Sequence, residues 1–269
     1  MLERQMNLTI LTVSPNFSLS MNMNKNIALK IGANFCWVKH VNHCLETKIT
    51  RLTQNNSSQS EGTFFEYEFA TTNITDFYNH AILYNVADMI SDNNSKHWFL
   101  WVDSDELISL KLIEDICFEL PKMKITTNYG ISRIWVKKID NSWCSSQIAV
   151  SNNKTVDWQY RLFNPIGVSP DFGVHKNFKF KKKCELITKQ SILHLIYEVE
   201  GLESRCKKIA GYEEVEPGAG ISKIRYYLPE LYSNSQAYWN KCSDYEAEYL
   251  DSWKNAYDNS ASYGNYFSD

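Results

Sequence analysis

The stretch HWFLWVDSDE, residues 97 to 106, decides the fold that we expect from this sequence. An apolar run of strand-forming residues ends abruptly in the carboxylates of Asp103, Asp105 and Glu106. Such a run is typical of a strand that is buried on both faces, as at the centre of a parallel sheet. Packed carboxylates repel one another unless a cation or hydrogen-bond donors neutralise them. The stretch therefore predicts a central strand whose carboxyl end carries a charged site.

Strand-like and helix-like patterns alternate on both sides of this stretch. In chain order the strand patterns cover residues 7–13, 35–41, 64–70 and 97–102, with a polar loop at 54–60, and helical spacing covers residues 23–31, 75–90 and 110–120. Alternation of this kind predicts a mostly parallel sheet with helices on both faces, because parallel neighbours need crossover connections. We therefore expect an α/β fold.

The pattern changes after residue 129. Three strand-like runs follow at residues 131–139, 156–163 and 191–199, and they are separated by long loops. From about residue 201 the chain has helical patches and many tyrosines, and it ends in the weakly apolar SASYGNYFSD. We expect a main domain over residues 1–200 and a C-terminal extension over residues 201–269 that is partly helical with a frayed tail.

The composition argues against several classes of protein. The chain has 269 residues, 43% of them hydrophobic, which is enough for a large core. A net charge of -3 gives no electrostatic case for nucleic-acid binding. No run of about 18 apolar residues and no signal peptide is found, so membrane contact is at most peripheral. Seven scattered cysteines without a C-x-x-C pair argue against a zinc ribbon or a disulfide scaffold and favour the reducing cytoplasm.

The residues alone leave two readings of the carboxylate cluster. In an open α/β sheet, ligands bind at the carboxyl ends of the strands, where Asp103 and Asp105 can face one divalent cation or one polyol. Mg²⁺ and Mn²⁺ prefer carboxylate oxygens and usually keep partners from a substrate phosphate. In the other reading, residues 103–106 cap the amino end of the following helix. The preceding apolar strand and the alternating pattern favour the cation.

Several longer segments resemble family 2 glycosyltransferases of the GT-A fold. YNHAILYNVADMISDNNSKHWFLWVDSDELI, residues 78–108, is similar to the family's central segment, in which an asparagine-containing helix leads to a strand that ends in a D-x-D motif. TILTVSPNFS, residues 9–18, resembles the first strand and its turn toward the nucleotide. WQYRLFNP, FGVHK and ILHLIYE, residues 158–165, 172–176 and 192–198, resemble the R-L-F, V-H-E and H-x-x-Y elements of lipopolysaccharide-core-like members. The pieces lie within roughly residues 8–212, and their order and spacing carry the resemblance.

The resemblance implies a nucleotide-diphospho-sugar transferase of the Rossmann-like GT-A fold with a C-terminal helical extension. The implied activity is inverting, metal-dependent transfer of a sugar from a nucleotide-sugar donor, UDP- or GDP-linked, to a glycan or a lipid-linked sugar, as in polysaccharide biosynthesis. The cofactor would be Mn²⁺ or Mg²⁺. The implied metal ligands are Asp103, Asp105 and His194, and the implied nucleotide contacts are Ser14, Pro15, Asn85 and Asp103.

Inverting transfer also needs a base that deprotonates the acceptor hydroxyl. The V-H-E-like element has Lys176 where the family has a glutamate that can serve as this base, and the nearest acid is Asp171. We take Asp171 as the candidate base, with Asp157 and Glu106 as rivals. A loop aspartate after Ser-Pro is also a common turn residue.

Three further residues complete the expected site. Arg161 can pair with a diphosphate or an acceptor acid through its planar guanidinium, although an exposed strand arginine is an equal alternative. His175 can bond the acceptor or satisfy a neighbouring backbone group. His194 is flanked by two leucines, so its residue pattern alone also fits a histidine that faces the core.

A second function stays open because the chain departs from the family pattern at two points. Lys39, His40 and Asn42 stand after the second strand, where the family often has an aspartate that reads the nucleotide base. Lys176 replaces the glutamate. The alternative is a catalytically impaired relative of the same fold that binds a nucleotide or a sugar. We discount a phosphatase of the haloacid dehalogenase type, because its D-x-D motif normally follows the first strand.

Overall fold

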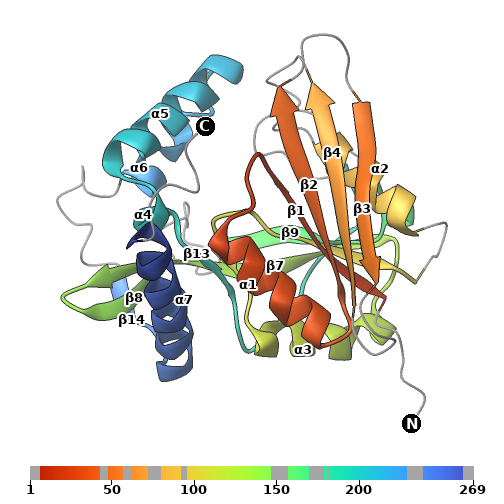
Figure 1. Ribbon diagram of the computed structural model, residues 1–269, viewed down its shortest axis with the longest axis horizontal. Helices are drawn as coiled ribbons and strands as arrows, with labels where there is room; N and C mark the ends of the chain where they lie inside the picture. Colours follow the sequence, from red (N-terminus) through yellow and green to blue (C-terminus); the bar gives the residue numbers. More distant parts are fainter. Residues whose placement is uncertain are drawn as a thin grey trace.

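The computed structural model describes residues 7–42, 48–56, 62–71, 80–91, 96–146, 157–169, 179–180, 182–228 and 239–262. Within these ranges the chain is a mixed α/β fold built on one twelve-stranded sheet, beside a two-stranded ribbon (Figure 1). None of the helices in these ranges is long and apolar enough to cross a membrane.

The centre of the sheet is parallel, as the alternating pattern predicts. β1 (Leu8–Ser14) lies between β5 (Trp98–Trp101) and β2 (Asn34–Asn42), and β2 pairs in parallel with β4 (Thr63–Thr71). Numbered by their order along the chain, these four parallel strands run 3-2-1-4 across the sheet, as in the nucleotide-binding half of a doubly wound fold. The strand order therefore reverses at β1, and the carboxyl ends of β1 and β5 lie at this switch point.

Helices cover both faces of this centre, as expected (Figure 1). α1 (Leu19–Lys30) and α3 (Leu110–Glu119) pack on one face, and α2 (His80–Ser91) packs on the other. Successive strand residues point to opposite faces, so Ile10 joins the core under α1 and α3 while Leu11 joins the core under α2. The apolar strands of the centre are consequently buried on both sides.

The expectation of a mostly parallel sheet is wrong beyond this centre. β9 (Asp157–Phe163) pairs antiparallel with both β5 and β7 (Thr127–Ile139). β7 then forms a hairpin with β8 (Ser142–Ser146), whose turn residues Asp140 and Asn141 have φ values of 47° and 63°, the conformation that tight two-residue hairpins require. Antiparallel neighbours need no helical crossover, which explains why no helical pattern separates the strand-like runs at 131–139 and 156–163.

One strand occupies part of the expected polar loop at 54–60. β3 (Lys48–Asn56) pairs antiparallel with β4 at the edge of the sheet, and the described residues between β2 and β4 form this strand instead of a helix. Its Arg51 and Leu52 are exposed. An edge strand needs little apolar surface, and charged side chains there discourage pairing with other chains.

The expected strand at 191–199 is a short strand followed by a helical turn. β13 (Ile192–His194) pairs in parallel with β7 and antiparallel with β6 (Glu106–Leu107), and α4 (Ile196–Val199) follows at once. The strand ends just before Leu195, whose N–H donates to the carbonyl of Asp105 at 2.8 Å and whose backbone, with φ -95° and ψ 7°, starts α4. The remaining short strands are β10 (Val168–Ser169), β11 (Lys179–Phe180), β12 (Lys182–Glu185) and β14 (Trp239–Lys241).

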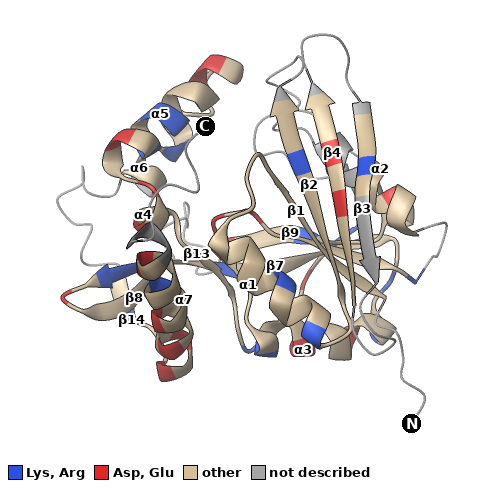
Figure 2. Cartoon of the chain, in the orientation of Figure 1, with Lys and Arg blue, Asp and Glu red and all other residues tan. Residues whose placement is uncertain are grey.

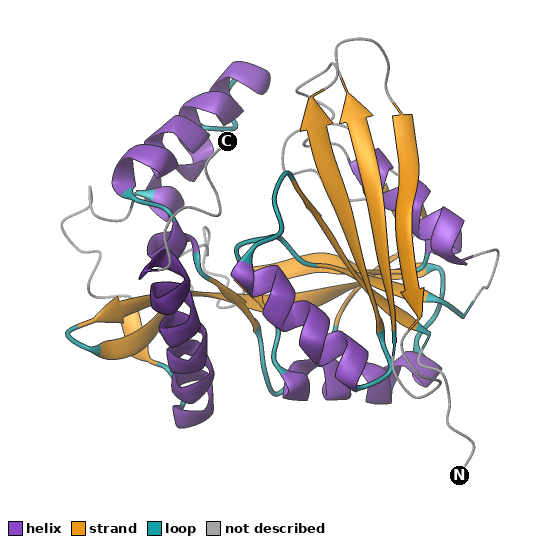
Figure 3. Cartoon of the chain, viewed as in Figure 1, coloured by secondary structure: helices purple, strands orange, loops and turns teal. Residues whose placement is uncertain are grey.

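The described residues after 201 include the α-helices α5 (Leu202–Val215), α6 (Ile224–Tyr227) and α7 (Asp244–Ser262) (Figure 3). α7 carries several acidic residues along its length (Figure 2), and it buries Leu250 and Trp253 completely in a cluster with residues of β6, β7 and β13. These helices thus share a core with the sheet. Of the expected frayed tail, residues 260–262 belong to α7 and the rest lies outside the described residues.

Candidate functional site

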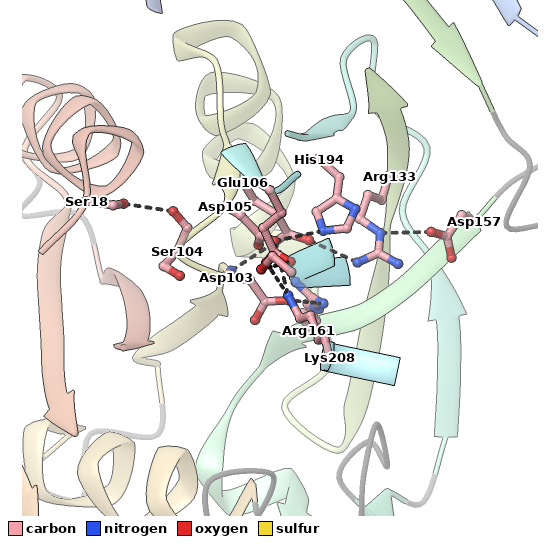
Figure 4. Close-up of polar contacts among 12 residues, drawn as sticks. Ser18, Asp103, Ser104, Asp105, Glu106, Arg133, Asp157, Arg161, His194 and Lys208 are labelled. Atoms are coloured by element: carbon pink, nitrogen blue, oxygen red, sulfur yellow. Dashed lines mark hydrogen bonds and ion pairs between the residues drawn. The ribbon is translucent and has the colours of Figure 1, made fainter. Parts of the chain in front are cut away.

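The acidic residues after β5 form a turn whose backbone is fixed from two sides. Ser18, at the start of α1, donates its hydroxyl to the carbonyl of Ser104 at 2.8 Å (Figure 4). Asn24 of α1 is completely buried and holds the backbone just after the turn. Its Nδ2 donates to the carbonyl of Glu106, and its Oδ1 accepts from the N–H of Ile108. On the other side, Leu195 binds the carbonyl of Asp105. The carboxylates are therefore presented from a rigid loop.

These acids do not cap the next helix. The N-cap of α3 is Ser109, whose hydroxyl accepts a hydrogen bond from the N–H of Leu112 at 3.2 Å. The short strand β6 lies between the acidic turn and this cap. The alternative reading of residues 103–106 as a helix cap is therefore wrong.

A buried network of charges surrounds Glu106, whose side chain is completely buried. One carboxylate oxygen accepts from Arg133 Nη1 at 3.1 Å, and the other accepts from Arg161 Nη1 at 2.5 Å. Arg161 also donates Nη2 to Asp103 Oδ2 at 2.8 Å, and its guanidinium lies 4.6 Å from the centre of the Trp101 ring. Both oxygens of Glu106 are thus held by buried cations, so Glu106 does not suit the role of a base.

Asp157, the other rival base, is held in the same way. Arg133 donates Nε to Asp157 Oδ2 at 2.8 Å, and Gln159 donates to the other oxygen at 2.6 Å. Burial acts to raise the pKa of Asp157, but the charges of Arg133 and Arg161 and the hydrogen bonds from Arg133 and Gln159 together lower the pKa below its usual value. A carboxylate with a lowered pKa is a weak proton acceptor at neutral pH.

Asp105 faces two nitrogen groups on the other side of the turn (Figure 4). His194 Nε2 lies 3.3 Å from Asp105 Oδ2, and Lys208 Nζ lies 3.7 Å from the same oxygen. Burial acts to raise the pKa of Asp105, but His194 and Lys208 outweigh it and hold the pKa well below its usual range. Asp105 is therefore ionised at neutral pH.

The donor chemistry at Asp105 and His194 fits a divalent cation held by two side chains. Neighbouring ligands of an octahedral ion with bonds of about 2.0–2.1 Å lie about 3 Å apart, close to the separation seen here. Among the described residues, His, Cys, Asp and Glu form no group of three that would make a closed metal cage. An ion at this place would take its other ligands from substrate phosphates and water, as Mg²⁺ commonly does. Asp103 is the third expected ligand, and its Oδ2 accepts a hydrogen bond from Arg161.

The expected nucleotide contacts fall in two places. Ser14 and Pro15 lie at the carboxyl end of β1, beside the acidic turn, because Leu11 of β1 pairs with Trp101. Ser14 is buried there and accepts from the indole N–H of Trp37 at 3.2 Å. Asn85 is exposed on α2 and, among the described residues, makes no hydrogen bond to the acidic cluster.

The expected acceptor side has no described geometry. Asp171, His175 and Lys176 lie outside the described residues. The structure brings together Asp103, Asp105, Arg161 and His194 from the expected set.

Two residues of the cluster were not expected from the sequence. Arg133 lies in the strand-like run at 131–139. The alternation of apolar and polar residues there does not show whether the arginine side chain faces a carboxylate. Lys208 lies beside a buried stripe of α5 formed by Arg205, Ile209 and Tyr212. The helical spacing of that stripe can be recognised in the sequence. The sequence does not show, however, that Lys208 lies next to Asp105.

Comparison with models of known protein families and with curated protein sequences gives no match for this chain. The chemistry of the cluster therefore carries the functional interpretation. It combines an ionised carboxylate, a facing imidazole and three buried or half-buried cations at the switch point of the sheet.

Proposed function

We propose that this chain is a metal-dependent inverting glycosyltransferase of the GT-A fold. It would move a sugar from a UDP- or GDP-linked donor to a glycan or a lipid-linked sugar. The observation that carries the proposal is the facing pair of Asp105 and His194, 3.3 Å apart at the carboxyl end of the β5 segment. Doubly wound folds bind nucleotides at this switch point, and a cation held there can reach a diphosphate.

The chain's own residues support donor binding in two ways. Asp105 and His194 would hold a Mn²⁺ or Mg²⁺ ion, which would supply positive charge to neutralise the leaving diphosphate. Asp105 stays ionised, and His194 is held rigidly because β13 is paired on both sides and its ring meets Trp135 edge to face at 4.3 Å. The buried network of Glu106 and Arg161 fixes Asp103 in advance, so little reorganisation is needed when charge develops.

The base in this proposal is Asp171, with His175 at the acceptor. The geometry of Glu106 and Asp157 favours neither rival, because arginines hold both carboxylates. Inverting transfer places the acceptor hydroxyl on the side of the sugar opposite the leaving diphosphate, so a base separate from the acidic turn suits the reaction.

One observation favours the second candidate, a nucleotide- or sugar-binding relative without turnover. Every described carboxylate of the cluster is engaged by an arginine, a lysine or a histidine. If Asp171 does not act as the base, the described residues of the cluster offer no replacement.

A turnover assay across nucleotide sugars separates the two functions. Release of UDP or GDP is measured for wild type and Asp105→Asn with Mn²⁺, over UDP-glucose, UDP-galactose, UDP-N-acetylglucosamine and GDP-mannose, with and without glycan acceptors. We expect turnover with at least one donor that Asp105→Asn abolishes. Glu119, which is partly exposed and pairs with Lys122 on the surface, provides Glu119→Gln as a control. Donor binding without turnover would support the binding relative. The absence of both donor binding and turnover would refute the proposal.

A further inference from the structure

Lys208 brings the segment after residue 201 into the acidic site. Its ammonium lies 3.7 Å from Asp105 Oδ2 and 2.9 Å from Glu200 Oε1, with the ring of Tyr227 5.7 Å away. Its neighbour Lys207 instead points to solvent, where it pairs with Glu203 and is 76% exposed. Two adjacent lysines of α5 thus have opposite environments, and only one of them faces the site.

Lys208 keeps its charge in this position. Burial acts to lower the pKa of Lys208, but the charges of Asp105 and Glu200 and the hydrogen bond to Glu200 together raise the pKa above its usual value. The separation of 3.7 Å from Asp105 is longer than a direct hydrogen bond. The ammonium is therefore charged and not locked onto the Asp105 carboxylate, and the Lys208 side chain as a whole is 30% exposed.

We propose that Lys208 binds the diphosphate of the donor beside Asp105 and shares the neutralisation of its charge with the divalent cation. The inference rests on the proposed function, because it names a further residue of the same site. A lysine suits this role because its ammonium is a compact charge on a flexible stem and a common phosphate ligand. Its movement toward a phosphate would leave Asp105 free for the cation.

This arrangement makes a distinctive prediction, because Lys208 and the cation are drawn to the same oxygen and repel each other. Removal of the ammonium should weaken binding of a nucleoside diphosphate in the absence of metal. The same change should strengthen binding of Mn²⁺ in the absence of nucleotide. A purely structural role would weaken both or change neither.

The experiment measures these two affinities separately on the full chain. Calorimetry gives the affinity for UDP and for GDP in EDTA, and electron paramagnetic resonance gives the affinity for Mn²⁺ alone. The variants are Lys208→Met, Lys208→Arg and, as a matched control on the same helix, Lys207→Met. For Lys208→Met we expect UDP or GDP to bind about 10- to 100-fold more weakly, the effect of losing one charge-assisted hydrogen bond, and Mn²⁺ about tenfold more tightly. Lys208→Arg should keep diphosphate affinity within a few-fold, and Lys207→Met should change neither affinity.

Each outcome has one meaning. Opposite shifts in Lys208→Met support the inference. Equal diphosphate affinity in Lys208→Met and Lys207→Met overturns it while leaving the proposed function intact, and weaker binding of both ligands overturns it by assigning Lys208 a structural role. A wild type that binds neither UDP nor GDP, with or without Mn²⁺, overturns the proposed function and this inference together. Lys208→Gln replaces Lys208→Met if near-ultraviolet circular dichroism shows that the latter does not fold.

Discussion

His194 Nε2 faces Asp105 Oδ2 at 3.3 Å because the backbone sets the approach of the two side chains. β13 pairs antiparallel with β6, and His194 stands opposite Glu106, the residue that follows Asp105. The Leu195 N–H then binds the carbonyl of Asp105 itself. The two candidate metal ligands are therefore positioned before any ligand arrives.

Replacing either of these ligands should remove the cation. We expect Asp105→Asn to weaken Mn²⁺ binding in the presence of UDP or GDP by more than about 100-fold, since even residues that only support a metal ligand contribute about 10- to 100-fold. His194→Gln should also weaken it. Electron paramagnetic resonance of Mn²⁺ measures both, with Glu119→Gln as the control. Unchanged affinity in Asp105→Asn would rule out a metal at this position.

Glu106 should matter for stability more than any surface acid. Glu106→Gln leaves Arg133 and Arg161 buried with less compensating charge. Breaking a buried ion pair in this way costs about 3–5 kcal/mol of the free energy of unfolding, measured by urea denaturation. Glu119→Gln breaks an exposed pair with Lys122 and should change the same quantity by less than about 0.5 kcal/mol. Similar values for the two variants would contradict a tightly coupled network.

His97 should make the fold sensitive to mild acid. Its ring is buried, lies 2.8 Å from Thr9 Oγ1 and packs on Phe99. Burial lowers the pKa of His97 to about 4 from an ordinary value of 6.5. Between these values the unfolded chain binds a proton that the folded chain excludes, so this contribution to stability is complete above pH 6.5 and is lost as the pH falls toward 4.

The expected loss is about 3 kcal/mol, from about 1.4 kcal/mol for each unit by which the pKa is lowered. Urea denaturation at pH 7, 5.5 and 4.5 measures it, and comparison with His97→Gln removes the contributions of other groups. The stability of wild type relative to His97→Gln should fall by most of this amount between pH 7 and 4.5. A difference that stays constant would show that His97 takes up its proton equally in both states.

Two glycines give opposite predictions for the same substitution. A Cβ on Gly62 would lie 1.7 Å from the carbonyl oxygen of Ala33, so Gly62→Ala should destabilise the fold by about 1–3 kcal/mol. A Cβ on Gly211, within α5, would meet nothing within 4 Å. Gly211→Ala should therefore stabilise by about 0.5–1 kcal/mol through better helix propensity. Thermal unfolding of both variants tests the pair.

The parallel centre of the fold could be predicted from the sequence because its strands are largely apolar and because α1 and α2, which have recognisable helical patterns, lie in two of the three connections between them. β3 was missed because an edge strand such as Lys48–Asn56 is polar and resembles a loop in composition. The strand-like run at 191–199 was misleading, since a run of alternating apolar residues does not show that the chain turns at Leu195.

Part of the candidate site could also be predicted from sequence patterns. The acids after β5 and His194 belong to recognisable elements, and the structure brings them together. Their cationic partners Arg133 and Lys208 come from β7 and α5, and only the pairing of the sheet and the packing of α5 decide which acids they meet. Sequence patterns show which face of a single helix or strand is apolar. They carry little information on contacts between residues that are far apart in the sequence.

The burial of Leu250 and Trp253 has a consequence for synthesis of the chain. These side chains of α7 cover apolar surface on Leu107, Val136 and Leu193, all of which leave the ribosome earlier. Domains generally fold as units during translation, so β6 and β13, which hold the acidic turn and His194, keep an open flank until α7 has emerged. A translational pause before α7 would expose that flank to chaperones and proteases. A stop codon there would yield a chain that contains all the candidate ligand residues but lacks the helix that completes the packing around β6 and β13.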